Sequence, residues 1–115
     1  EFWQAQQLDE DAQADLNIAA EEILSNIIRH GAAAEPIRLS VTIDTHEIRM
    51  QFEDAGVEFD PVRHSSLDPA APLEARRAGG MGIYMVLRLM DRAAYRRQDG
   101  RNQLTLTRLR ERSGR

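Results

Sequence analysis

The spacing of apolar residues changes near Pro36, and this change most limits how the chain can fold. Before it, apolar residues recur every three or four positions, which predicts an amphipathic helix from about Asp9 to His30. Asp9 suits the N-cap of that helix, and Gly31 is the expected stop just after it. After Pro36, apolar and polar residues alternate, which is typical of half-buried strands. The chain therefore combines helices and strands in separate runs.

The same patterns predict the remaining elements. They are strands over residues 37–43, 48–52, 94–97 and 104–106 and a helix from Met81 to Asp91. Two short turns, Asp44-Thr45-His46 and Asp99-Gly100, join the strands in pairs. This order favours an α+β two-layer sandwich, in which helices pack on one face of a mixed, mostly antiparallel sheet.

Composition excludes several classes of chemistry. The 115 residues carry 15 basic and 19 acidic side chains, and the net charge of −4 argues against a mainly electrostatic nucleic-acid binder. Because cysteine is absent, disulfides, thiolate zinc sites and cysteine nucleophiles are ruled out. Every basic residue is arginine, so neither a lysine-dependent Walker loop nor a lysine Schiff base is available. With no membrane-length apolar run and no visible signal peptide, a cytosolic protein is expected.

The first candidate site is a polar stripe on the helix predicted for residues 9–30. At about 100° per residue, Glu22, Asn26 and His30 lie one above another beside the apolar face. A carboxylate and an amide oxygen at this spacing suit a general base and a ligand for a hard cation. A solvated polar face with an i,i+4 pair is the structural alternative.

The second candidate site is Asp54-Ala55-Gly56, which follows the strand predicted for residues 48–52. A carboxylate at the end of a strand can accept a hydrogen bond from an exocyclic amine, and a glycine lets a flat ring approach the backbone. A plain Asp-x-Gly turn is the alternative interpretation.

The third candidate site is Gly79-Gly80-Met81-Gly82, which leads straight into a predicted helix. Glycines at a helix start expose backbone N–H groups to an anion, and the helix dipole adds a favourable field. Arg76 and Arg77 are near enough in sequence to reach phosphate oxygens, although solvation of both is the alternative. No predicted strand immediately precedes the glycines, which excludes a Rossmann fingerprint.

Taken together, the three sites resemble the N, G1 and G2 boxes of the Bergerat-fold ATPases. The matching strings are Glu22-x-x-x-Asn26-x-x-x-His30-Gly31, Asp54-x-Gly56-x-x-Phe59-Asp60-Pro61 and Gly79-Gly80-x-Gly82. Within that superfamily, the chain is similar over about residues 9–110 to the RsbW-type branch of bacterial anti-sigma factors that are serine-protein kinases. The tail strings Tyr95-Arg96-Arg97 and Gly100-x-Asn102-x-Leu104-x-Leu106 also resemble that branch.

The resemblance implies a Bergerat ATP-binding fold that uses ATP and Mg²⁺. Glu22 would be the catalytic base, and Asn26 would hold the Mg²⁺ that bridges the phosphates. Asp54 would bind the adenine amino group, and Gly56 would leave room for the base. The other implied ATP contacts are Arg77 (or its neighbour Arg76), Gly80, Gly82 and Asn102, with an ATP lid over residues 62–79.

The implied function is that of a cytoplasmic, ATP-dependent serine/threonine-protein kinase. It would phosphorylate a STAS-type anti-sigma-factor antagonist and so regulate transcription. The alternative is a non-catalytic, nucleotide-dependent module that sequesters a sigma factor or an antagonist. A homodimer is compatible with the resemblance, and direct binding to nucleic acid or a membrane is not expected. Because the family has an N-terminal strand and a complete first helix, we expect the single domain 1–115 to lack that strand and part of that helix.

Overall fold

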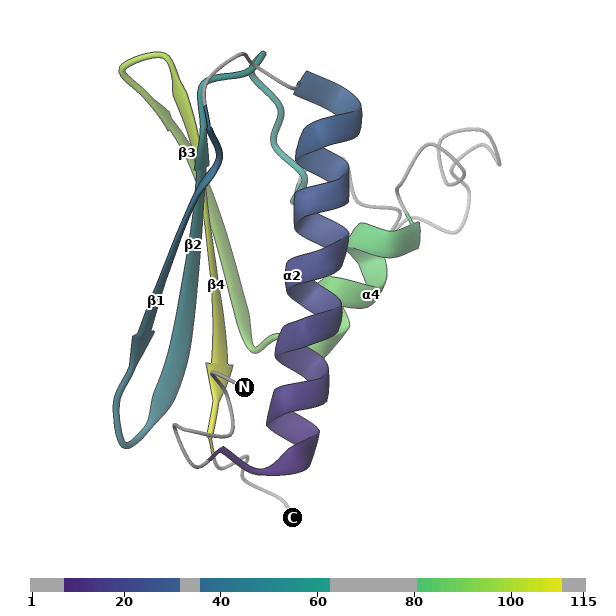
Figure 1. Cartoon of the computed structure of the whole chain (residues 1–115), viewed down its shortest axis with the longest axis vertical. Helices are drawn as coiled ribbons and strands as arrows, with labels where there is room; N and C mark the ends of the chain where they lie inside the picture. Colours follow the sequence, from purple (N-terminus) through teal and green to yellow (C-terminus); the bar gives the residue numbers. More distant parts are fainter. Residues whose placement is uncertain (1–7, 32–35, 63–80, 111–115) are drawn as a thin grey trace.

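A computed structural model describes residues 8–31, 36–62 and 81–110 as two packed layers (Figure 1). Two helices, α2 (Glu10–Gly31) and α4 (Met81–Leu89), lie on the same side of a four-stranded sheet. The strands are β1 (Arg38–Ile43), β2 (Glu47–Asp54), β3 (Arg92–Gln98) and β4 (Arg101–Leu109). The α+β sandwich that the sequence predicts is confirmed.

The sheet joins two hairpins side by side in the order β1-β2-β4-β3. All three pairings between the described strands are antiparallel. The central pairing of β2 with β4 sets Asp54 opposite Asn102 and Phe52 opposite Leu104. This register brings the last residue of β2 beside the start of β4, although the two lie 48 residues apart in the chain.

Helix α2 begins as the sequence predicts. The Asp9 carboxylate accepts a hydrogen bond of 2.7 Å from the Ala12 peptide N–H, which confirms the N-cap. The helix includes Gly31 instead of ending just before it, a difference of one residue that is common at helix ends. The remainder of the first helix expected at the start of the chain lies outside the described residues. Leu8, the first described residue, is buried and precedes α2.

The hairpin turns adopt the conformations that their residues favour. Asp99 and Gly100 have φ angles of 55° and 75°, the left-handed pair of a two-residue type I′ turn. In the other turn, Asp44 Oδ1 accepts hydrogen bonds from the peptide N–H groups of the second and third residues after it, at 2.7 and 2.8 Å. Helix α4 ends before Asp91, because the Asp91 peptide N–H donates to the Thr107 carbonyl of β4 at 2.8 Å.

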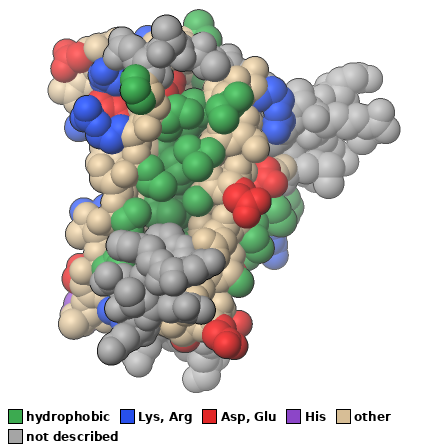
Figure 2. Space-filling view, viewed as in Figure 1, with side chains coloured by type: hydrophobic (Ala, Val, Ile, Leu, Met, Phe, Trp, Pro, Cys, Tyr) green, Lys and Arg blue, Asp and Glu red, His purple; other side chains and the backbone are tan. Residues whose placement is uncertain are grey.

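The core lies between the two helices and one face of the sheet. Its largest fully buried side chains are Leu16, Ile48, Met50, Phe52, Val86 and Leu106. Strand β1 is less covered, since Leu39 is exposed although its partner Phe52 on β2 is buried. Figure 2 shows apolar side chains that reach the surface in a band between the sheet and α2.

The opposite face of the sheet carries polar side chains. Glu47 pairs there with Arg49 and Arg92, each at 2.8 Å, and Glu53 lies 3.6 Å from Arg101. The alternation of inward apolar and outward charged residues fits a sheet that is covered by helices on one side. Neither helix of the described chain has the length and apolar content needed to cross a membrane.

Candidate functional site

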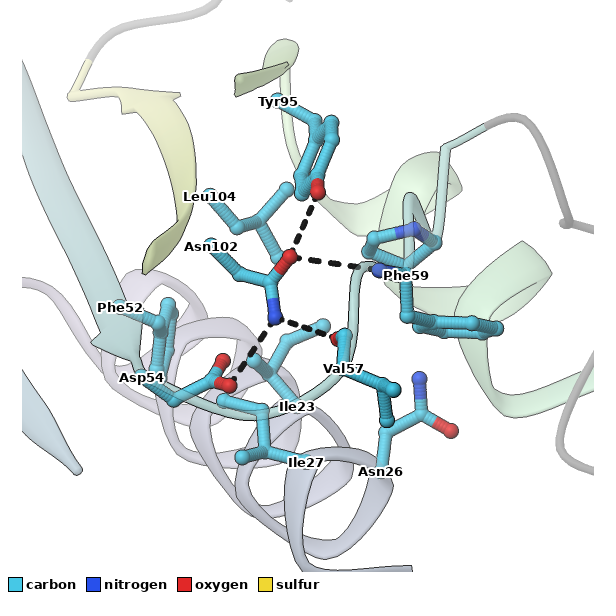
Figure 3. A pocket seen from close by; sticks show the side chains of 11 residues that line it. Ile23, Asn26, Ile27, Phe52, Asp54, Val57, Phe59, Tyr95, Asn102 and Leu104 are labelled. Atoms are coloured by element: carbon cyan, nitrogen blue, oxygen red, sulfur yellow. Dashed lines mark hydrogen bonds between the residues drawn. The ribbon is translucent and has the colours of Figure 1, made fainter. Parts of the chain in front are cut away.

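A cavity that is partly open to solvent lies where α2 meets the end of β2 and the start of β4 (Figure 3). Its apolar wall includes Ile23 and Ile27 from α2, Phe52 from β2 and Leu104 from β4. An apolar wall with a few polar groups at one end suits a flat ring that carries hydrogen-bonding edges.

Three polar side chains singled out from the sequence meet in this cavity. Asn26 from α2, Asp54 from the end of β2 and Asn102 from the start of β4 all line it. They are only 5%, 6% and 7% exposed. Asn26 therefore lies in a cleft beside the core and not on a solvated helix face. The structure brings the three residues together, and their binding to a ligand stays a prediction.

The Asp54 carboxylate is held by two hydrogen bonds. Its Oδ1 accepts one from the Gly56 peptide N–H at 2.8 Å and one from the Asn102 side-chain amide at 3.0 Å. The bond from Gly56 is the turn that was the structural alternative for this motif. Because both bonds end on Oδ1, the turn does not compete with a ligand that approaches Oδ2.

The Asn102 amide nitrogen joins β4 to the loop that follows β2. It donates to Asp54 Oδ1 at 3.0 Å and to the Val57 carbonyl at 2.8 Å. Both N–H groups of this amide are therefore used inside the protein. Figure 3 shows the two bonds side by side below the amide group.

The Asn102 amide oxygen accepts hydrogen bonds from three groups. They are the Tyr95 hydroxyl at 2.5 Å, the Arg97 guanidinium at 3.1 Å and the Phe59 peptide N–H at 3.2 Å. Burial raises the pKa of the Tyr95 hydroxyl, and the nearby negative charge of Glu58 raises it further. Tyr95 therefore stays a protonated donor over a wider range of pH than an exposed tyrosine.

Glu22 is not part of the cavity wall, but it lies one helical turn before Asn26. Its carboxylate packs against the first turn of α4, where a Cβ on Gly82 would overlap it. The atom that would be met is the end of the flexible Glu22 side chain, so the contact shows that this carboxylate reaches the first turn of α4. The peptide N–H groups at the start of α4 thus lie close to the Glu22 carboxylate.

Several predicted residues lie outside the described part of the chain. They are Arg76, Arg77, Gly80 and the proposed lid apart from Val62, so their roles stay predictions. Within the described residues, no group of three histidine or acidic side chains could hold a metal ion. A Mg²⁺ ion held by one amide and by ligand phosphates does not need such a group.

Tyr95 and Arg97 contact Asn102 in the site, although the sequence motifs include them only in a tail string and give them no role. The turn Asp99-Gly100 is the signal that could have found them. A two-residue turn sets the residues on either side in a fixed register, and here Arg97 lies opposite Asn102 and Tyr95 opposite Leu104. Tyr95 and Arg97 therefore flank the position that the motifs had identified.

The chain is similar to known proteins over most of its length. Residues 1–108 match the family model of the histidine kinase-like ATPase domain. The chain is also similar to the serine/threonine-protein kinase BtrW of Bordetella bronchiseptica, at 32% identity over 95 residues. The aligned region covers 80% of this chain and 67% of the relative.

Proposed function

Because the chain belongs to the histidine kinase-like ATPase domain family, we propose that it is an ATP-dependent serine/threonine-protein kinase. Membership of the family implies that it binds ATP. The proposed substrate is a STAS-type anti-sigma-factor antagonist, and the proposed role is cytoplasmic control of a sigma factor. The observation that carries the proposal is the meeting of Asn26, Asp54 and Asn102 at one cavity, one helical turn from Glu22.

Asp54 is the proposed contact for the adenine amino group. Its Oδ1 is already held inside the protein, so Oδ2 is the oxygen that would accept the hydrogen bond. At that position adenine carries an amine that donates and guanine carries an oxygen that only accepts. A fixed carboxylate should therefore favour ATP over GTP, while Ile23 and Phe52 would cover the apolar part of the ring.

Asn26 is the proposed protein ligand for Mg²⁺. The residue fits this ion because Mg²⁺ commonly takes one or two protein oxygens and completes its shell with phosphates and water. When bound, the ion would neutralise phosphate charge during transfer. Asn26 is only 5% exposed and lines the cavity together with Ile23 and Ile27 of the same helix.

Glu22 is the proposed general base. It would take the proton of the acceptor hydroxyl while that oxygen bonds to the γ-phosphorus of ATP. The bond from the phosphorus to the β–γ bridging oxygen breaks in the same step, and ADP leaves. The start of α4 beside Gly82 offers peptide N–H groups for phosphate oxygens, which are stabilised there by the helix dipole. Transfer of this kind depends mainly on positioning and charge.

Labelling of a purified STAS-type antagonist with radioactive ATP tests this function. We expect phosphate transfer that requires Mg²⁺. The Glu22→Gln variant should still bind ATP but transfer phosphate about 10²–10⁴-fold more slowly, the usual contribution of a general base. Glu21→Gln, at an exposed neighbouring position on α2, is the matched control and should behave as the unmodified protein.

Transfer at the unmodified rate by Glu22→Gln would reject this residue as the base. A protein that captures a sigma factor or an antagonist only in the presence of nucleotide, but transfers no phosphate, would favour the alternative of a non-catalytic binding module. Capture assays with ADP and with ATP separate these outcomes.

A further inference from the structure

We propose that Asn102 is a positioning residue that fixes Asp54 and the loop 55–59 in the orientation that selects adenine. In this role Asn102 does not itself bind the nucleotide, unlike the direct ATP contact that the family resemblance implies. The inference rests on the proposed function, because it concerns how the same site recognises its base.

The hydrogen-bonding capacity of Asn102 is already used. A side-chain amide has two N–H donors and one oxygen with two lone pairs. The two donors go to Asp54 Oδ1 and to the Val57 carbonyl. The oxygen accepts from three groups. With its donors and its oxygen occupied, Asn102 has no capacity left for an adenine edge.

The partners of Asn102 also determine which way its amide points. Its oxygen faces two groups that can only donate, the Arg97 guanidinium and the Phe59 peptide N–H, and also accepts from the Tyr95 hydroxyl. Rotation of the amide by half a turn would set its N–H groups against these donors. The donor side of Asn102 is therefore directed at Asp54.

This arrangement supports the carboxylate from two sides. Asn102 connects Asp54 to the loop 55–59, and Arg97 holds the same loop through a hydrogen bond of 2.8 Å to the Gly56 carbonyl. Without the amide, the bond from the Gly56 N–H is the one that would still restrain the Asp54 carboxylate within the described part of the chain. The carboxylate could then rotate, and Oδ2 would no longer be held in the orientation that accepts a hydrogen bond from an amine on the base and disfavours a carbonyl there.

Calorimetric binding of ATP and GTP, each with Mg²⁺, tests the inference. In Asn102→Ala the affinity for ATP should fall by about tenfold or more, while the affinity for GTP should change little. The preference for ATP over GTP should therefore decrease. Loss of general structural integrity would weaken both nucleotides alike. Gln103→Ala is the matched control, because Gln103 is the next residue on β4 and bonds to Arg96 on the opposite face of the sheet.

A double-mutant cycle with Asp54→Ala shows whether Asn102 acts through Asp54. If it does, Asn102→Ala should have little further effect once Asp54 is replaced. Additive losses would mean that Asn102 contacts the base directly, and they would overturn the inference. Unchanged affinity and preference in Asn102→Ala would also overturn it.

Two further results complete the test. If Asn102→Ala does not fold, Tyr95→Phe removes one bond to the amide oxygen and keeps the ring. It should reduce the preference for ATP about threefold, and an unchanged preference would contradict the inference.

Failure of the unmodified protein to bind ATP, or ATP binding that does not depend on Asp54, would instead contradict the proposed function.

Discussion

Among the side chains around the cavity, Tyr95 is the one whose protonation is most clearly affected by its surroundings. It donates to the Asn102 amide oxygen, and its burial and the negative Glu58 raise its pKa. A phenol whose pKa is higher in the folded than in the unfolded protein stabilises the fold at low pH. That contribution is complete below about pH 10, the unfolded value, and is lost as the pH rises through the folded pKa.

Titration of Tyr95 by ultraviolet absorbance of its phenolate checks this direction. Tyr84→Phe leaves Tyr95 as the single tyrosine of the chain. We expect a midpoint above about pH 10 in the folded protein, because burial disfavours the charged phenolate. The urea-unfolded variant is the control and should titrate near about pH 10. A folded midpoint at or below that of the unfolded chain would contradict the environment described for Tyr95.

At the scale of elements, a buried ion pair ties α2 to β4 at the end away from the cavity. Arg108 is 2% exposed, and its Nε lies 3.0 Å from Asp15 Oδ2 on α2. Arg108 also donates to the Leu109 carbonyl. The pair replaces apolar packing at this end of the inward face of β4, so removal of one partner leaves a buried charge.

Asp15→Ala should therefore lower the free energy of unfolding by about 3 kcal/mol, measured by urea unfolding. Glu53→Ala removes the carboxylate that lies 3.6 Å from Arg101 on the open face of the sheet and should cost at most about 1 kcal/mol. The double variant Asp15→Leu with Arg108→Met should recover most of the loss, because no unpaired charge remains. Equal losses for Asp15→Ala and Glu53→Ala would show that burial of Arg108 adds no cost.

The elements themselves could be predicted because each follows from local physics. The Asp9 cap, the alternation along β2 and the Asp99-Gly100 turn depend on residues close together in the chain. The pairing of β2 with β4 could not be derived from periodicity, since alternation specifies which face is buried but not which strand is adjacent. The support of Asp54 by Asn102 depends on that pairing, so motif spacing alone could not reveal it.

At the scale of the whole molecule, the candidate site crosses the junction between two hairpins. Asp54 ends the second strand of the first hairpin, and Asn102 is the second residue of the second strand of the other. A ligand that contacts both sides of this junction binds only the folded protein, and binding energy then adds to folding stability.

With MgATP at about one hundred times its Kd, the free energy of unfolding should rise by about 2.7 kcal/mol, measured by urea unfolding. Hydrogen exchange should slow most in the paired amides of β2 and β4, because ligand binding opposes their separation. Asp54→Ala at the same nucleotide concentration should show a much smaller gain. Equal gains in both proteins would place the nucleotide away from this junction.

Because the cavity is built from both hairpins, the chain can bind nucleotide only after the two hairpins have paired during folding. A newly made or partly opened chain holds Asp54 without the amide that steadies it, because Asn102 arrives only when β2 and β4 have met. Such a chain would compete poorly for nucleotide. Nucleotide binding in this fold therefore distinguishes completely folded chains from incompletely folded ones.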